Sequence, residues 1–190
     1  CNKLSTEEKR QLVEWTIEDA GGRVPVSVTV SENTLEGQRD AIDHARGVGV
    51  AWVVMQPPPV RGASSDALVD FFAAVADGFD LPLGIQNAPD YIGIGLDNSA
   101  IRKLANRAQN IQILKAEGPA PYVGSLMMEL GRDFMVFNGR NGVELIDNLR
   151  LGCVGTIPGV ECCDLQVQIY DSWRNGDYLG ARIQFQDALP

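Results

Sequence analysis

Lys115 and Glu117 form the pair best suited to chemistry on a carbonyl compound. Lys115 closes the run Ile111-Gln112-Ile113-Leu114-Lys115, which is typical of a buried strand, and Gly118-Pro119 predicts that this strand ends shortly afterwards. Burial disfavours the ammonium form of a lysine, and a free amine attacks carbonyl carbons. Lys115 is therefore a candidate imine-forming (Schiff-base) nucleophile. The alternative is a strand-end lysine whose charged head reaches into water.

Glu117 stands two positions after the lysine. Side chains of a strand alternate between its two faces, so this spacing predicts that Lys115 and Glu117 share a face. A carboxylate beside the amine could act as a general acid or base in water loss or in carbon–carbon cleavage. It would also favour the protonated lysine, which opposes the effect of burial. The alternative is a surface carboxylate in a tight turn.

The elements that must position this pair alternate along the chain between strand-like and helix-like patterns. The strand-like segments are 24–30, 50–55, 81–86, 111–115, 134–137 and 153–157. The helix-like segments are 6–20, 35–46, 65–77, 98–108, 122–130 and 142–151, followed by a helical tail from about residue 165. Ser5 and Glu8 form a capping box at the first helix, and Ser65 is the expected cap of the third.

This alternation predicts an α/β fold with a parallel sheet, either doubly wound or closed into a (β/α)8 barrel. The sequence contains neither of the glycine-rich nucleotide motifs that would favour the doubly wound form. A closed barrel needs eight strands, and the patterns supply six. We therefore expect a barrel that lacks its first two strands in this chain, with a partial barrel over residues 1–160 and a C-terminal helical region over 161–190.

In such a barrel the functional groups lie where the strands end. The residues at the predicted strand ends include the polar Gln86, Asn87 and Asn138, with Gly139 directly after Asn138. An alternative for Gln86 and Asn87 is a hydrogen-bonding pair that satisfies loop backbone.

Composition excludes several classes of function. The 190 residues carry a net charge of −9 and no basic cluster, which argues against a nucleic-acid partner. No apolar stretch approaches the roughly 20 residues that span a bilayer, so no membrane partner is expected. The four cysteines lack zinc-site spacing, and the chain has a single histidine. We expect a cytoplasmic protein with reduced cysteines and with no metal or organic cofactor.

The ordered motifs resemble the dihydrodipicolinate synthase / N-acetylneuraminate lyase family along essentially the whole chain. The segments that carry the resemblance are Leu81-Pro82-Leu83-Gly84-Ile85-Gln86-Asn87-Ala88-Pro89, Ile113-Leu114-Lys115-Ala116-Glu117, Gly152-Cys153-Val154-Gly155-Thr156-Ile157-Pro158-Gly159 and Ile169-Tyr170-Asp171-Ser172-Trp173-Arg174-Asn175-Gly176-Asp177. The resemblance implies a class I aldolase-type lyase acting on a 2-keto acid such as pyruvate, commonly a homotetramer. It also implies that Lys115 forms the imine, and that backbone near Gly139 and Ile157 helps to bind the keto acid. Asn87 and Asn138 are further candidate substrate-binding residues.

Three departures from the family pattern refine this expectation. The family's Gly-Thr-Thr-Gly-Glu-type segment would precede Cys1, Gln86 replaces a proton-relay tyrosine, and Pro57-Pro58-Pro59 replaces a second one. Glutamine does not shuttle protons but can orient a water molecule. The Lys-x-Glu pattern resembles that of family dehydratases of 2-keto-3-deoxy sugar acids, and together with these losses the resemblance implies such a dehydratase, using Lys115, Glu117 and Gln86. The alternatives are a pyruvate-dependent aldolase, an enzyme similar to 4-hydroxy-tetrahydrodipicolinate synthase, or a truncated, inactive barrel with a structural role.

Overall fold

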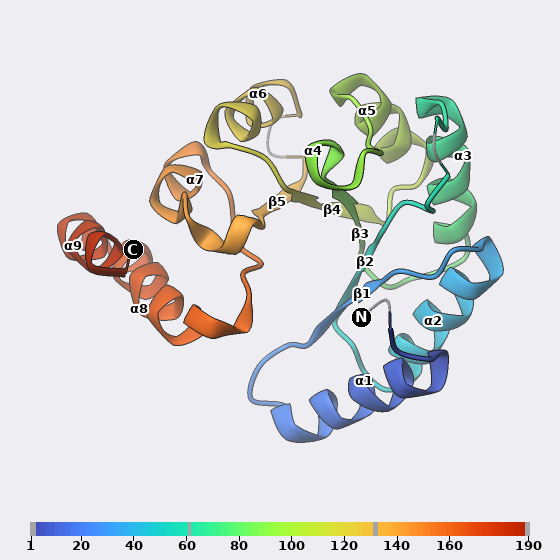
Figure 1. The fold of residues 1–190 in the computed structure, drawn as a ribbon, viewed down its shortest axis with the longest axis horizontal. Coiled ribbons are helices and arrows are strands. Elements are labelled where there is room, and N and C mark those ends of the chain that lie inside the picture. Colours follow the sequence, from blue (N-terminus) through green and yellow to red (C-terminus); the bar gives the residue numbers. More distant parts are fainter. Residues whose placement is uncertain (1–2, 61, 131–132, 189–190) are drawn as a thin grey trace. The chain divides into compact units, whose positions relative to one another are not determined.

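The structure is a computed structural model that describes residues 3–60, 62–130 and 133–188. The chain divides into two compact units, one ending at Leu114 and the other beginning at Lys115. The ribbon in Figure 1 shows strands and helices alternating along the chain within each unit. Strand β4, Ile111–Ala116, spans the boundary, so its last two residues belong to the second unit.

The first unit is built from four parallel-sheet strands and the helices that connect them. Its elements are α1 (Thr6–Ala20), β1 (Ser27–Val30), α2 (Leu35–Gly47), β2 (Trp52–Met55), α3 (Ser65–Ala76), β3 (Leu83–Asn87), α4 (Pro89–Ile92), α5 (Asn98–Arg107) and the start of β4. The strands lie in the order β1-β2-β3-β4. The pairs β1/β2 and β2/β3 are parallel, so these strands end at the same edge of the sheet.

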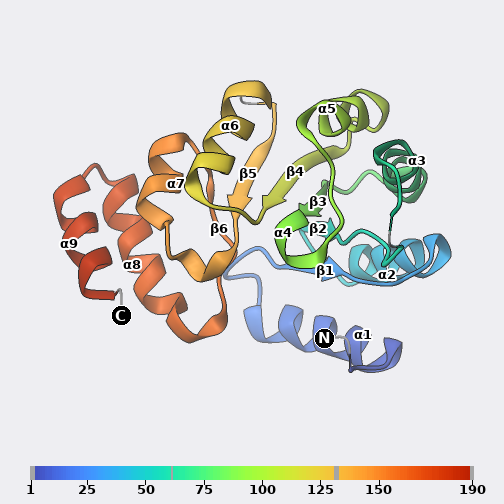
Figure 2. The same ribbon diagram turned by 45° about the horizontal axis from the view of Figure 1, so that its top comes forward.

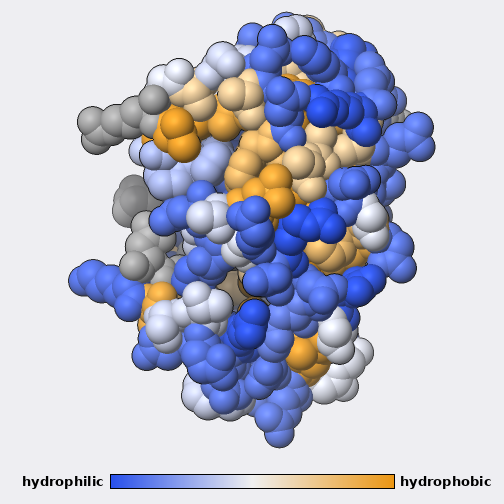
Figure 3. Space-filling view, turned by 90° about the vertical axis from the view of Figure 1, so that its right-hand side faces the viewer, coloured by the Kyte–Doolittle hydropathy of each residue, from blue (hydrophilic) through white to orange (hydrophobic). Residues whose placement is uncertain are grey.

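The helices of this unit cover one face of its strands. Figures 1 and 2 show α2, α3 and α5 side by side, outside β1 to β4. Much of the outward surface on this side is hydrophilic, with a broad apolar area across the upper half of the view and smaller apolar areas below it (Figure 3). Behind it the core is formed by apolar residues of the strands and of the inward helix faces, including Phe72, Met55, Ile85 and Leu104, each at most 1% exposed. The apolar strand segments thus form the centre of the unit.

Local capping chemistry sets the starts of these helices. Ser5 and Glu8 make the expected capping box, with the Ser5 N–H donating to Glu8 Oε2 at 2.7 Å. Asp97 caps α5 in the same way, through a bond from a backbone N–H of the first turn. The expected cap at Ser65 is wrong by one residue. Ser64 has the extended backbone and accepts the N–H bond, and Ser65 is the first helical residue.

The second unit follows the end of β4 with two further strands and a helical C-terminal region. Its elements are α6 (Ala120–Leu130), β5 (Met135–Asn138), the 3-10 turn η1 (Arg140–Gly142), α7 (Leu145–Leu151), β6 (Gly155–Thr156), the 3-10 turn η2 (Val160–Cys162), α8 (Cys163–Arg174) and α9 (Tyr178–Ala188). Strand β5 lies between β4 and β6 in the strand order, and its pairing with β6 is parallel. The expected domain boundary at residue 160 falls inside this unit and stays a prediction.

Helices α7, α8 and α9 share a small hydrophobic core. Its buried members are Leu145, Ile146, Leu149, Ile169 and Ala181, with Tyr170, Trp173 and Phe185 packed against them. The Trp173 and Tyr178 rings meet edge to face, with their centroids 4.7 Å apart. The expected helical region after the last strand is therefore confirmed as a packed helix pair, visible as the red elements of Figure 2.

The structure confirms an α/β fold with parallel strands at all six expected places and a C-terminal helical region. Helix α4 was not expected, because its four residues are too few to show a helical period. The helix expected over 142–151 begins only at Leu145, because Gly142 has a positive φ of 74° and Glu144 has a non-helical backbone with a φ of −125°. Closure into a barrel stays a prediction. Within the described residues, no helix is long and apolar enough to cross a membrane.

Candidate functional site

Lys115 and Glu117 meet at the end of β4, as their spacing predicts. Lys115 Nζ lies 3.0 Å from Glu117 Oε1, and the two side chains are only 13% and 17% exposed. The neighbouring strand residues Leu114 and Ala116 are fully buried. The lysine therefore projects from a buried strand end towards a carboxylate that is itself largely buried. At this distance a proton can pass directly between the amine and the carboxylate.

Gly139, the residue after β5, lies directly against the Glu117 side chain. A Cβ atom added at Gly139 would lie 2.2 Å from Glu117 Oε1, closer than any real contact between such atoms. Gly139 is itself buried. The structure therefore brings Gly139 together with Lys115 and Glu117. Its expected contact with a keto acid stays a prediction.

Asn138, the last residue of β5, ties three segments of the second unit together. Its Nδ2 donates to Gly118 O at 3.0 Å and to Asn148 Oδ1 at 3.2 Å. Its own carbonyl accepts the Thr156 hydroxyl and the Ile157 N–H, each at 2.8 Å. The side chain is fully buried. Asn138 thus joins the loop after β4, the end of β6 and helix α7, and it places Ile157 beside the end of β5.

The loop after β5 continues this network through charged and amide side chains. Arg140 makes a half-buried ion pair with Glu144, with Nη1 and Oε2 2.7 Å apart. Asn141 Oδ1 accepts the Gly159 N–H at 2.8 Å, and Asn141 O accepts from Gln166 Nε2 at 2.9 Å. These contacts hold the loops after β5 and β6 together.

Gln86 and Asn87 lie at the end of β3 in the first unit. Gln86 Oε1 accepts a hydrogen bond from Gln56 Nε2 at 2.7 Å. The Asn87 side chain makes two bonds to one loop residue, accepting the Leu96 N–H at 2.8 Å and donating to Leu96 O at 2.9 Å. Asn87 is 1% exposed. It therefore satisfies loop backbone, and the roles of both residues toward a substrate stay predictions.

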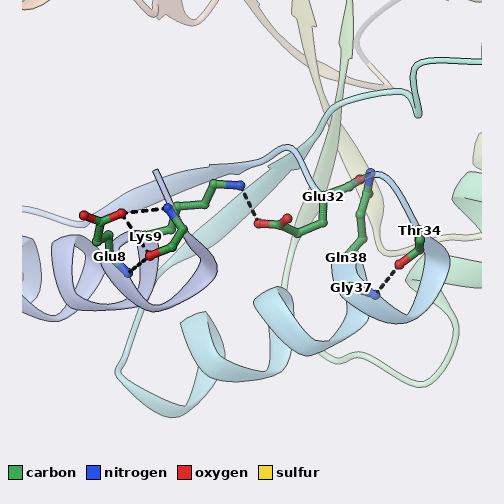
Figure 4. Close-up of polar contacts among 7 residues, drawn as sticks. Glu8, Lys9, Glu32, Thr34, Gly37 and Gln38 are labelled. Carbon is green, nitrogen blue, oxygen red and sulfur yellow. Dashed lines mark hydrogen bonds and ion pairs between the residues drawn. The ribbon is translucent and has the colours of Figure 1, made fainter. Parts of the chain in front are cut away.

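A polar row that the sequence did not reveal follows the ends of β1 and β2. Gln38, on α2, is fully buried and donates to Glu32 O at 2.9 Å and to Gln56 O at 2.8 Å. Figure 4 shows this arrangement, with Lys9 of α1 reaching Glu32 at 2.8 Å and Thr34 capping α2. The one available signal was a glutamine on the inward face of an amphipathic helix. Such a residue must find partners there, because a buried amide without them is costly.

Residues 3–60, 62–130 and 133–188 contain no evident cluster of metal ligands. No group of three His, Cys, Asp or Glu side chains is arranged there to hold a metal ion. Cys153, Cys162 and Cys163 are free thiols. Burial raises the pKa of the Cys153 thiol to about 11, which lowers its thiolate fraction near neutral pH.

Comparison with known proteins gives one consistent family. A model described as the dihydrodipicolinate synthetase family matches residues 1–189. A 4-hydroxy-tetrahydrodipicolinate synthase from Methanospirillum hungatei is 32% identical over 184 residues, which cover 94% of this chain and 62% of the relative. The L-2-keto-3-deoxyarabonate dehydratase of Azospirillum brasilense is 28% identical over 194 residues, which cover 98% and 62% of the two chains.

A solved structure supports the same assignment at the level of the fold. A prophage protein of the dihydrodipicolinic acid synthase family from E. coli K12, crystallised with pyruvate, superposes with a TM-score of 0.89 at 25% identity. The match covers 97% of this chain and 64% of that protein. The chain thus spans about 62–64% of the length of these three proteins. It belongs to the dihydrodipicolinate synthetase family.

Proposed function

We propose that this chain carries the catalytic lysine of a Schiff-base lyase, in which Lys115 attacks the carbonyl carbon of a 2-keto acid. The observation that supports this most directly is the partly buried pair of Lys115 Nζ and Glu117 Oε1, 3.0 Å apart. A lysine amine reacts only when it is unprotonated, and an adjacent carboxylate can take its proton as the nitrogen attacks. The carboxylic acid so formed and the attacking nitrogen each supply one proton to the carbonyl oxygen, which leaves as water, and a protonated imine remains.

The imine would then act as an electron sink for bond breaking at the neighbouring carbons. Glu117 removes a proton from the carbon beside the imine, and the C–H electron pair moves into the imine to form an enamine. The enamine expels a hydroxyl group from the next carbon, and the protonated Glu117 supplies the proton that turns it into water. A single carboxyl group thus serves first as base and then as acid.

We favour dehydration of a 2-keto-3-deoxy sugar acid, because that reaction uses the Lys-x-Glu pair for both proton transfers. The Azospirillum relative is named for such a dehydration. A reaction similar to 4-hydroxy-tetrahydrodipicolinate synthase is the second candidate, because several relatives carry that name, including those from Methanopyrus kandleri and Bacillus subtilis. Gln86 in place of a relay tyrosine argues against this second candidate.

Borohydride trapping tests the imine itself. The chain, and the protein made from the full open reading frame that encodes it, would each be incubated with pyruvate and reduced with borohydride. Peptide mass mapping would then locate any adduct. We expect a reduced pyruvyl adduct on Lys115 and none in Lys115→Ala. The matched control is Lys103→Ala. Lys103 lies on α5, its side chain is 57% exposed, and it forms an ion pair with Asp66 and not with Glu117. Trapping that is absent, or that persists in Lys115→Ala, would refute the proposal.

Substrate assays separate the two candidate reactions. A dehydratase converts a 2-keto-3-deoxy sugar acid to a product lighter by one water, with no aldehyde partner. A synthase consumes pyruvate only when an aldehyde is supplied. We expect the first result, and we expect Glu117→Gln to reduce kcat by roughly 10²–10⁴-fold while Lys115 still traps pyruvate, though more slowly, because the amine loses the carboxylate that takes its proton. Imine chemistry needs no metal ion, so treatment with a chelator is expected to leave the rate unchanged.

The remaining expectations concern the whole protein. We propose that its partner is a small 2-keto acid, that it assembles as a homo-oligomer and that it works in the cytoplasm. Family membership supports these proposals. Sedimentation of the full open reading frame product measures the assembly directly, and a monomer with full activity would exclude a required oligomer.

A further inference from the structure

The Glu117 side chain is seated in space that only a glycine at position 139 leaves open. A Cβ atom on Gly139 would lie 2.2 Å from Glu117 Oε1, 2.7 Å from its Cγ and 2.8 Å from its Cδ. All three nearest atoms belong to this one side chain. Gly139 has a φ of −89° and a ψ of −118°, and this ψ lies outside both the helical and the extended ranges, so the backbone itself favours glycine here. The contact with Glu117 is a second and separate reason for glycine at this position.

The backbone beside Glu117 is held from the same strand end. Asn138 Nδ2 donates to the carbonyl of Gly118, the residue directly after Glu117, at 3.0 Å. The same amide donates to Asn148 Oδ1, so helix α7 fixes its orientation. Because Asn138 is fully buried, its side chain is placed to hold this loop.

We propose that Gly139 and Asn138 are positioning residues that hold the Glu117 carboxylate against Lys115. The open space at Gly139 lets the carboxylate lie 3.0 Å from Lys115 Nζ, and the Asn138 amide fixes the loop from which Glu117 projects. This inference rests on the proposed function for its catalytic consequence. It extends that function by making residue 139 the position that decides whether a glutamate can serve the lysine.

A larger side chain at position 139 would force Glu117 away from the amine. The backbone of both segments is buried at this point, since Gly118 and Gly139 are both buried. The side chain that can move is therefore Glu117. Displacing it by even about 1 Å lengthens a proton transfer that depends on hydrogen-bond distance, and such misplacement costs up to about 10²-fold in rate.

A double-mutant cycle tests the contact without relying on activity. The variants are Gly139→Ala, Glu117→Ala and both together, compared by thermal unfolding of the intact protein. We expect Gly139→Ala alone to lower the melting temperature by about 4 °C or more, because it overpacks a buried contact. In the Glu117→Ala background the same change should cost clearly less, because the clash with Glu117 is gone and only the backbone preference for glycine remains. An equal loss in both backgrounds would show that Gly139 serves the backbone alone and would overturn the inference.

Kinetics test the consequence. We expect Gly139→Ala to lower kcat by about 10–100-fold, to alter the pH–rate profile and to leave pyruvate trapping at Lys115 intact. In Glu117→Ala it should cause no further loss. Gly47→Ala is the matched control, because its added Cβ would contact nothing within 4 Å. If Lys115 traps no pyruvate in the parent protein, the proposed function fails, while the thermal cycle still decides whether Gly139 seats Glu117.

Discussion

Replacing Asn87 with alanine removes a two-bond clamp between the end of β3 and the loop before α5. The Asn87 amide accepts the Leu96 N–H at 2.8 Å and donates to Leu96 O at 2.9 Å, and both residues are at most 5% exposed. Each hydrogen bond contributes about 0.5–1.5 kcal/mol net, and each buried group left unpaired costs about 1–3 kcal/mol. We therefore expect Asn87→Ala to lower the free energy of unfolding by roughly 2–5 kcal/mol.

Asn87→Asp separates the two bonds of this clamp. An aspartate oxygen can still accept the Leu96 N–H, but a charged carboxylate cannot donate to Leu96 O and instead faces it. This places a carboxylate in a site that favours its protonated form. A carboxyl group whose folded-state pKa is raised stabilises the fold below its unfolded pKa and loses that contribution as pH rises. We expect the Asn87→Asp defect to be large at pH 7 and smaller at pH 4.

Urea unfolding followed by circular dichroism measures both variants. Asn33→Ala is the matched control, because Asn33 is exposed in the same unit, and we expect its effect to stay within about 0.5 kcal/mol. If Asn87→Ala unfolds within about 1 kcal/mol of the parent, the clamp argument is wrong. If stability is unchanged and KM for the keto acid rises many-fold, the side chain binds substrate instead.

Two further predictions concern titratable groups. Burial raises the pKa of Cys153 to about 11, so at pH 8 an alkylating reagent should label the exposed Cys163 and leave Cys153 unlabelled until the protein unfolds, as peptide mass mapping would show. Equal labelling of both thiols in the native protein would contradict this expected difference in labelling. Because the pKa of Cys153 is higher in the folded state, the contribution of this thiol to stability declines as pH rises from about 9 towards 11. Hydrogen bonds from the Ala100 N–H and the Ser99 hydroxyl lower the pKa of Asp97 below 3.8, so its capping contribution is present at pH 7 and is lost as pH falls through that lowered value. Asp97→Ala should cost about 0.5–2 kcal/mol of unfolding free energy at pH 7 and somewhat less below pH 4, where the carboxyl group is neutral, whereas Asp97→Asn keeps an acceptor and should cost little. A loss that does not change with pH would show that the carboxylate charge adds nothing to the cap.

Local chemistry explains how much of the fold was predictable. Helix α1 runs over the expected residues because its capping box and its terminal Gly21 act within a few positions. The Ser64 cap was missed by one residue because Ser64 and Ser65 are both capable caps, and the backbone conformation at Ser64 chose between them. The late start of α7 was missed because glycine fits both a helix start and a turn, and Gly142 takes a turn conformation with a φ of 74°.

The candidate site likewise has features that short-range sequence patterns predicted and features that they could not predict. Strand alternation alone placed Lys115 and Glu117 on one face, because that rule acts over two residues, and their atoms lie 3.0 Å apart. No short-range pattern could show that the Asn87 amide would bind Leu96, or that Glu117 would occupy the space beside Gly139. Those contacts join residues 9 and 22 positions apart, through loops whose paths depend on how the strand ends pack. The sequence by itself therefore determined most of the helices and strands and the placement of Lys115 beside Glu117, whereas only the tertiary structure decided which buried polar groups hold these two residues and their loops in place.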